Sequence, residues 1–173
     1  MPTGRGTLGL FGLLIALAAG PAVAAQPAAP NPLPLPRFVS LKSERVNVRV
    51  GPTKENQVGW VYTRVGLPVE IIAEYDNWSR IRDWEGAEGW VLHSLLSGRR
   101  TALISAPAKS VDDFVPLHAS AEKQSEITAR LQAGVLATVK RCGNNWCRIT
   151  GQGFDGWIPQ ERLWGVYPGE TVE

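Results

Sequence analysis

The fold of this chain is decided by the stretch WSRIRDWEGAEGWV, residues 78–91. Two short runs, WSRIRD and EGWV, flank a tip that contains Gly86, which is the pattern of two strands joined by a tight turn. Similar segments rich in valine, isoleucine and aromatic residues precede it, RVNVRVG and PVEIIAEY among them. No sustained 3.6-residue period occurs after Phe38. The sequence therefore predicts an all-β protein of short strands.

The same pattern occurs twice in the chain. GLPV at 66–69 and WSRI at 78–81 recur 68 positions later as GVLA and WCRI, and EGWV at 88–91 recurs 67 positions later as DGWI. One deletion in the intervening loop explains the change in spacing. The upstream positions that we match are Val48 with Val115 and Val50 with Leu117. The chain therefore contains two copies of a unit of about 60–65 residues, a size at which a domain can just fold alone.

The order VNVRVGP, GLPVEII, DNWSRIRD, EGWV and LLSG resembles the bacterial SH3-like (SH3b) domain. The resemblance is strong over residues 40–97 and continues over 105–165, where VPLH at 115–118 replaces the NVRxGP opening. It implies two tandem small SH3-like barrels of short, strongly curled strands. Modules of this family are mostly non-catalytic and bind cell-wall peptides or carbohydrate, or pack against a neighbouring domain.

Five segments are expected on this basis. They are a signal peptide at 1–25, a proline-rich tether at 26–37, a first barrel at 38–100, a second, disulfide-stapled barrel at 101–166 and a C-terminal tail at 167–173. The apolar run at 8–20 follows Arg5 and precedes small residues, so a Sec-type signal peptidase would cleave after Ala24 or Ala25. We therefore expect a periplasmic or secreted product without stable membrane insertion after cleavage.

The tether and the charge balance suggest few special partners. PLPLPR resembles a proline ligand of SH3 domains, but Leu35 occupies one of the required proline positions, so a plain extended tether is the better interpretation. The chain has a net charge of +2, with acidic and basic residues interspersed. It lacks the basic stripe that nucleic acid would require.

Both cysteines lie in the segment CGNNWC, residues 142–147. Cys142 falls on Glu74 of the first copy and Cys147 on Ser79, so the pair occupies facing strands of a repeated hairpin. Zinc would need more ligands, and a redox pair would need two intervening residues and a helix N-terminus. In an exported chain the pair is best interpreted as a structural disulfide.

We expect no catalytic residues, no metal and no cofactor. His93 and His118 are interpreted as ordinary surface histidines, because neither stands near a nucleophile elbow. The acidic pairs Asp83/Glu85 and Asp112-Asp113 lie in turn-like stretches and are interpreted as solvated loops rather than as a glycosidase pair.

A ligand surface is predicted on the first copy. Its candidate residues combine aromatic rings with a guanidinium, and they are Arg49, Trp60, Tyr62, Tyr75 and Trp84. The alternative is that Trp60 and Tyr62 close the barrel or bury an interface between the copies. Trp164 ends the second copy and is expected to pack on it.

Two hypotheses for function follow. The first is an exported, non-catalytic module that recognises the peptide or glycan of peptidoglycan through the first barrel. The second is a periplasmic protein–protein adaptor in which the tandem barrels form a platform for an envelope protein, with no wall ligand.

Overall fold

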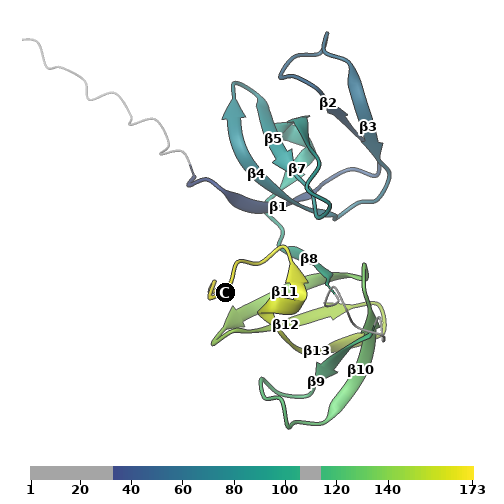
Figure 1. The fold of residues 1–173 in the computed structure, drawn as a ribbon, viewed down its shortest axis with the longest axis vertical. Coiled ribbons are helices and arrows are strands. Elements are labelled where there is room, and N and C mark those ends of the chain that lie inside the picture. Colours follow the sequence, from purple (N-terminus) through teal and green to yellow (C-terminus); the bar gives the residue numbers. More distant parts are fainter. Residues whose placement is uncertain (1–32, 106–113) are drawn as a thin grey trace, which may run out of the picture. The chain divides into compact units, whose positions relative to one another are not determined.

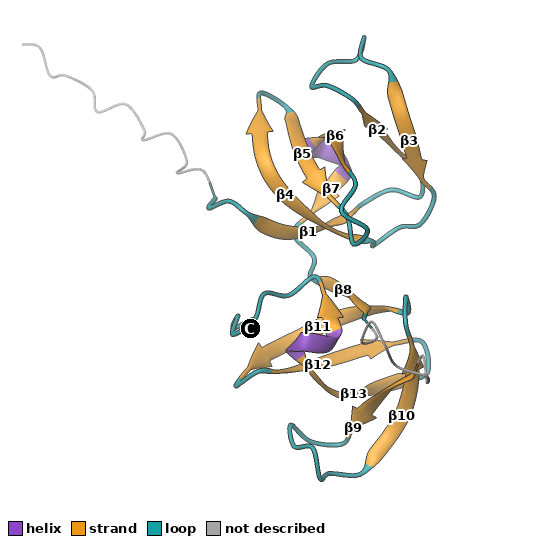
Figure 2. Ribbon diagram, viewed as in Figure 1, coloured by secondary structure: helices purple, strands orange, loops and turns teal. Residues whose placement is uncertain are grey.

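Short strands make up nearly all of the regular structure in the computed structural model, which describes residues 33–105 and 114–173 (Figure 2). The first copy consists of β1 (Arg37–Leu41), β2 (Val46–Arg49), β3 (Val58–Tyr62), β4 (Pro68–Tyr75), β5 (Trp78–Arg82), β6 (Glu88–Leu92), the 3₁₀ turn η1 (His93–Leu95) and β7 (Leu96–Ser97). The second copy consists of β8 (Thr101–Ile104), β9 (Phe114–His118), β10 (Ile127–Gln132), β11 (Leu136–Gly143), β12 (Trp146–Gly151), β13 (Phe154–Pro159), η2 (Gln160–Arg162) and β14 (Leu163–Trp164).

The two copies have the same topology. The first sheet has the order β3-β2-β6-β5-β4-β1-β7, and the second has the order β10-β9-β13-β12-β11-β8-β14. Every pairing is antiparallel, and the strands of each sheet curl as expected of a small barrel (Figure 1). The predictions of an all-β fold and of two tandem SH3-like barrels are confirmed.

The central hairpin is the part that the sequence repeat aligns correctly. Glu74 lies directly opposite Ser79 in the β4–β5 pair, and Cys142 lies directly opposite Cys147 in the β11–β12 pair. Both hairpins begin their turn with a residue of positive φ, Asp76 at 50° and Asn144 at 52°. Aspartate and asparagine tolerate this left-handed conformation, which is why both turns form without a glycine at these positions.

Our match of Val48 and Val50 with Val115 and Leu117 is wrong by two residues. Val46 and Val48 are fully buried on β2, as Leu117 is on β9, whereas Val50 is 65% exposed beyond the end of β2. Val46 therefore corresponds to Val115, and Val48 to Leu117, at a spacing of 69 positions. A strand buries every second residue, so a shift of two preserves the apolar pattern and is hard to detect from sequence.

Cross-strand pairing gives the same corrected alignment. Arg49 lies opposite Trp90 of β6, and His118 lies opposite Trp157 of β13. Trp90 and Trp157 are equivalent positions of the repeat, so Arg49 and His118 are also equivalent. The second copy therefore has a histidine where the first has an arginine. This histidine is buried, so the interpretation of His118 as a surface histidine is wrong.

Each copy has its own hydrophobic core, but the core of the first copy also includes side chains of the second copy. Residues 33–173 form one compact unit, and Leu103 of β8 belongs to the buried cluster of the first copy. Leu136 and Trp164 are partly buried against that same cluster. The expectation that Trp164 packs on the second barrel is therefore wrong, because its ring covers the core of the first.

The expected signal peptide, most of the proline-rich tether and the pair Asp112-Asp113 lie outside the described residues. In the described ranges no helix is long and apolar enough to cross a membrane.

Candidate functional site

Trp60 and Tyr62 lie on the inner face of β3. They are two residues apart, and they pair with Val48 and Val46, which are buried in the first core. Their rings meet edge to face, with centroids 6.2 Å apart. Tyr62 is only 8% exposed, so it is far less accessible than a surface ligand contact would be.

The hydroxyl of Tyr62 is anchored by Asp83. It donates a hydrogen bond of 2.7 Å to Asp83 Oδ2, while Asp83 Oδ1 accepts bonds from the backbone N–H groups of Glu85 and Ala87. Burial and this carboxylate both raise the pKa of Tyr62, so the phenol stays neutral. Asp83 is therefore the acceptor that organises the β5–β6 turn. The interpretation of Asp83/Glu85 as solvated is wrong for Asp83, which is buried by these contacts.

Trp84 lies on that turn, and its indole packs beside the ring of Tyr62. Its ring centroid lies 6.2 Å from that of Tyr62, and 40% of its surface remains exposed. Trp60, Tyr62 and Trp84 thus form a continuous aromatic series that runs from the core to the surface. Anchoring of this kind fixes an exposed indole in one orientation, which lowers the entropic cost of using it as a contact surface.

The exposed indole borders a cleft of about 640 Å³, which we call the Trp84 cleft. The first copy contributes Phe38, Glu70, Arg82 and the β5–β6 turn to its lining. The second copy contributes Gln160, Glu161, Trp164, Tyr167 and neighbouring residues. A volume of this size is typical of a site for a small ligand or a short segment of polymer.

Aromatic side chains form the apolar lining of the Trp84 cleft. Phe38 contacts Trp164 edge to face at 5.2 Å and Tyr167 at 4.6 Å between ring centroids. The indole Nε1 of Trp164 is buried and has no hydrogen-bond partner among the residues that the structure describes.

Polar groups at the cleft are held in a fixed network around Glu70. This carboxylate is 4% exposed and accepts hydrogen bonds from Arg82 Nε at 2.9 Å and Nη2 at 2.6 Å. Its other oxygen accepts a bond of 2.7 Å from the hydroxyl of Tyr167. Burial and Glu70 raise the pKa of Tyr167, so this hydroxyl also stays protonated. The Arg82 side chain remains 42% exposed and can still donate to a ligand.

The five predicted residues are therefore not one surface. Trp84 lines the Trp84 cleft, with Tyr62 and Trp60 behind it. Arg49 is on the opposite face of its strand and lines a separate hollow, while Tyr75 is 62% exposed beside the β4–β5 turn and lines neither. The alternation of side chains along β2 and β3 explains the separation.

Sequence reasoning missed most of the lining of the Trp84 cleft. Trp164 carried a usable signal, because it has no counterpart in the first copy. Phe38, Arg82 and Tyr167 carried none that a single sequence could provide, since their proximity depends on how the two copies pack.

The predicted disulfide between Cys142 and Cys147 is confirmed, with Cα atoms 4.1 Å apart. Both residues are buried in the second core. The bridge also supports the end of the chain, because the backbone of Cys142 exchanges hydrogen bonds of 2.8 and 3.1 Å with Val172. Residues 165–173, which we call the C-terminal strap, are thus bound to the second copy.

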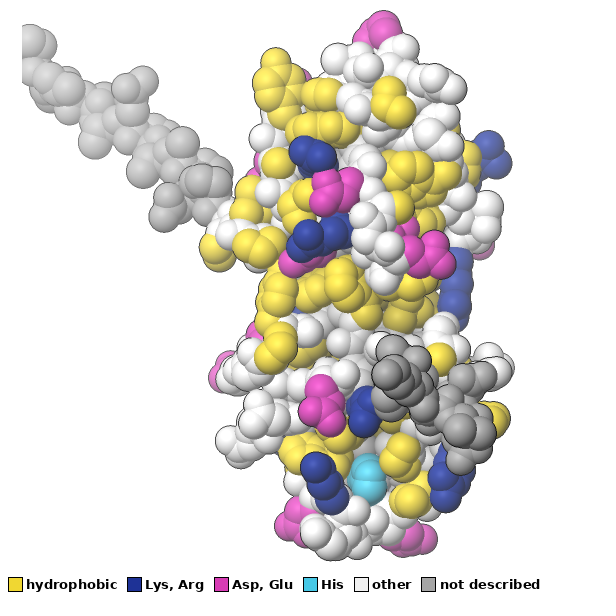
Figure 3. All heavy atoms as spheres, in the orientation of Figure 1, with side chains coloured by type: hydrophobic (Ala, Val, Ile, Leu, Met, Phe, Trp, Pro, Cys, Tyr) yellow, Lys and Arg dark blue, Asp and Glu magenta, His cyan; other side chains and the backbone are white. Residues whose placement is uncertain are grey.

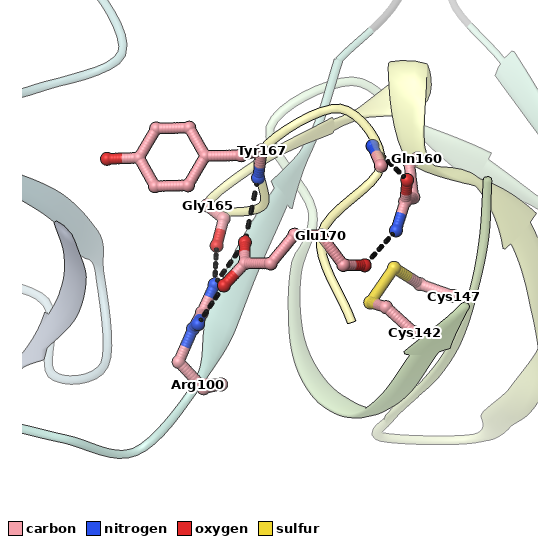
Figure 4. The surroundings of a disulfide bond; sticks show 8 residues. Arg100, Cys142, Cys147, Gln160, Gly165, Tyr167 and Glu170 are labelled. Carbon is pink, nitrogen blue, oxygen red and sulfur yellow. Dashed lines mark hydrogen bonds and ion pairs between the residues drawn. A yellow bond between two sulfur atoms is a disulfide. The ribbon is translucent and has the colours of Figure 1, made fainter. Parts of the chain in front are cut away.

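Further polar contacts hold the C-terminal strap in place (Figure 4). Arg100 pairs with Glu170, at 2.6 Å between Nη1 and Oε1, and also donates to the carbonyl of Gly165. The side chain of Gln160, which is buried, donates to the carbonyl of Glu170 and accepts from the N–H of Gly169. Tyr167, which belongs to the C-terminal strap, lines the Trp84 cleft.

At the position of the disulfide the first copy has a polar cluster. His93 Nδ1 lies 3.1 Å from Ser79 Oγ and 3.5 Å from Glu74 Oε1. A catalytic triad needs the two ring nitrogens to contact different partners, whereas here one nitrogen faces both. Ser79 is also fully buried, so substrate could not reach its hydroxyl.

Metal-binding geometry is not found in the described ranges, where no three His, Cys, Asp or Glu side chains are grouped to hold an ion. Charges of both signs are interspersed with hydrophobic side chains on the face seen in Figure 3. This face has no single-sign stripe of the kind that binds nucleic acid.

The chain has a distant similarity to solved structures. Two solved structures to which the chain is similar are NlpC2 and NlpC1 from Trichomonas vaginalis, at 12% and 11% identity. The matches cover 75% and 77% of this chain and 48% and 47% of those chains, with TM-scores of 0.34 and 0.33. The chain thus spans about half the length of these structures. No curated protein matches it.

The model of the bacterial SH3 domain family matches this chain twice, over residues 42–98 and 111–165. These matches cover β2 to β7 and β9 to β14, which is each seven-stranded sheet apart from its first strand in the chain. The chain therefore belongs to the bacterial SH3 domain family, of which it contains two tandem copies.

Proposed function

We propose that this protein is an exported, non-catalytic binding module that recognises the peptide or glycan of peptidoglycan. The proposal joins the family to three features of the chain, namely the expected signal peptide, the disulfide and the Trp84 cleft. Structural disulfides form and persist mainly in oxidising compartments, and the cell wall lies in one.

The exposed ring of Trp84 is the observation that carries the proposal. It is held by Tyr62 at the border of an aromatic cleft that also offers the guanidinium of Arg82. An aromatic face packs against the C–H surface of a sugar ring or an alanine methyl group, and a guanidinium donates to hydroxyl, amide or carboxylate oxygens. Wall glycan and its stem peptides present these groups side by side.

The site has the properties of a binding site rather than of a catalytic one. The carboxylate of Glu70 is used by Arg82 and Tyr167, and that of Asp83 by Tyr62 and the turn. Neither is left free to act as a general acid or base. A carboxylate that is already held by several donors orients its neighbours, and this is the role that we assign to both.

Sedimentation with purified peptidoglycan sacculi tests the proposal. The wild-type chain, produced in an oxidising compartment, should pellet with sacculi. Trp84→Ala should pellet several-fold less, because it removes the exposed indole at the border of the cleft. Tyr75→Ala is the control, since it removes an exposed aromatic ring of the first copy that lies outside the cleft.

Wild-type protein that stays wholly in the supernatant would refute wall binding. The adaptor hypothesis would then be preferred, and chemical crosslinking in the envelope would identify the partner. Equal loss of pelleting by Tyr75→Ala and Trp84→Ala would place the contact outside the Trp84 cleft.

A further inference from the structure

A second hollow of about 170 Å³ lies on the first copy, on the outer face of β2, and we call it the Arg49 hollow. Its rim carries three cationic side chains, Arg45, Arg49 and Lys54. Trp78, Leu92 and Leu95 form its apolar floor. Arg45 and Arg49 alternate with Val46 and Val48, which are buried, so strand geometry directs the two arginines outward together.

The charge of the Arg49 hollow is largely uncompensated. Ion pairs hold the other arginines of the first copy's central strands and of β1, and these pairs are Arg37–Glu74, Arg80–Glu88 and Arg82–Glu70. In the described part of the chain, neither Arg45, Arg49 nor Lys54 has a carboxylate within ion-pair distance. Arg49 instead donates to the backbone carbonyl of Asn56, which fixes its guanidinium at the rim.

One acidic side chain is close to this group. Glu55 has a lowered pKa, chiefly through hydrogen bonds from the backbone and from Thr53, and to a smaller degree through the charges of Arg49 and Lys54. Its carboxylate is fully exposed on the loop between β2 and β3. One acidic group beside three cations leaves the hollow with an excess of positive charge.

The second copy contains the same hollow with a different lining. At the corrected spacing of 69 positions, Phe114 replaces Arg45 and His118 replaces Arg49, while Lys123 corresponds to Lys54. The second hollow is larger, about 480 Å³, and its lining includes the cations Lys123 and Arg162 together with the carboxylate of Glu161. The fold therefore produces the hollow in both copies, and only the lining of the first has three cationic side chains and no acidic one.

We propose that the Arg49 hollow binds the free terminal carboxylate of a peptide, with the last side chain of that peptide on the apolar floor. Two guanidinium groups on one rim suit a carboxylate, because each can donate two parallel hydrogen bonds to its oxygens. The small volume fits a carboxylate and a small alkyl side chain, such as that of alanine. This site is separate from the Trp84 cleft, and neither proposal depends on the other.

NMR titration of the full chain tests the proposal, with backbone amides at 45–49 as reporters. The probes are acetyl-alanyl-alanine as the free acid, the same peptide as its C-terminal amide, and inorganic phosphate. The free acid should shift these amides in a saturable manner. The amide should bind at least about ten-fold more weakly, because it lacks the charge that the arginines recognise.

The second copy supplies the key variant. Arg45→Phe with Arg49→His gives the first copy the side chains that the same backbone carries in the second, so the fold is expected to tolerate them. This variant should lose at least about ten-fold in affinity for the free acid, and Arg45→Gln should lose part of it. Lys42→Gln is the matched control, since it removes an exposed cation outside the hollow and should leave binding unchanged.

Three results would overturn the proposal. The first is equal binding of the acid and the amide, and the second is full retention of binding by the double variant. The third is binding of phosphate as tight as that of the peptide, which would indicate general anion attraction. Because Trp84 is unchanged in all these variants, failure here leaves the peptidoglycan proposal intact.

Discussion

Removal of the disulfide should destabilise the second copy by an amount that the structure allows us to estimate. The bridge joins residues separated by 5 positions, so it closes a very short loop. The loop-entropy relation gives about 2 kcal/mol for a loop of this length. Replacing both cysteines by alanine costs more than this, because Cys142 and Cys147 are buried and their sulfur atoms fill space in the core.

Urea unfolding separates the two contributions. The oxidised protein, the protein reduced by a phosphine and the Cys142→Ala/Cys147→Ala variant are compared by tryptophan fluorescence. Reduction alone keeps both sulfur atoms, so it should lower the free energy of unfolding by about 2 kcal/mol, or the midpoint by roughly 1 M urea. The free energy of unfolding of the alanine variant should be lower still, because this variant also lacks both sulfur atoms.

Amide hydrogen exchange in the C-terminal strap tests this prediction locally. Val172 pairs with the backbone of Cys142, so amide exchange at Val172 should accelerate more than exchange in the first copy when the bridge is opened. Identical urea midpoints for the oxidised protein and the verified reduced protein would refute the reasoning. The same conclusion would follow if exchange changed equally in both copies.

Three further predictions concern single contacts. Tyr62→Phe removes a donor from the buried carboxylate of Asp83 and should lower the free energy of unfolding by about 1–3 kcal/mol. An unchanged melting temperature in calorimetry would contradict this. Leu103→Ala should lower the free energy of unfolding by about 2–5 kcal/mol and destabilise the first copy, although Leu103 belongs to the second. Amide hydrogen exchange that accelerates only in the second copy would argue against shared packing. The pKa of Glu170 lies below its ordinary value of 4.5, because hydrogen bonds from Arg100 and the backbone outweigh the effect of burial. The stabilisation that Glu170 provides is therefore complete above pH 4.5 and is lost as the pH falls through the lowered pKa. Glu170→Gln should therefore flatten the acid limb of the stability–pH curve, and an unaltered curve would rule out this role.

Local patterns were sufficient to predict the short strands and hairpins of each copy, whereas the SH3-like barrel followed from the resemblance to a known family. Strands that bury every second residue and turns that need left-handed residues are visible in one sequence. The disulfide was predictable for the same reason, since Cys142 and Cys147 flank a turn whose counterpart in the first copy is a hairpin. The error of two residues at Val48 and Val50 has the opposite cause, because a period of two does not distinguish such shifts.

The candidate site was only partly predictable. Trp84 could be assigned to the surface because it lies on a turn. Its cleft required knowledge of how the copies pack, which brings Trp164 and Tyr167 beside Arg82 from distant positions in the chain. No local pattern encodes that contact. The grouping of Arg49 with the aromatic residues failed for a different reason, because Arg49 lies on the outer face of β2 whereas Trp60 and Tyr62 lie on the inner face of β3.

The most direct test of the central claim is to observe the Trp84 ring while a wall ligand binds. The seven tryptophans can be labelled with 5-fluorotryptophan, and the fluorine resonance of Trp84 assigned from Trp84→Phe. On titration with soluble peptidoglycan fragments, we predict saturable shifts of the Trp84 and Trp164 resonances, with little change at Trp146 and Trp157. Shifts confined to the second-copy tryptophans Trp146 and Trp157, or no shifts at saturating fragment concentrations, would contradict recognition of the cell wall by the Trp84 cleft.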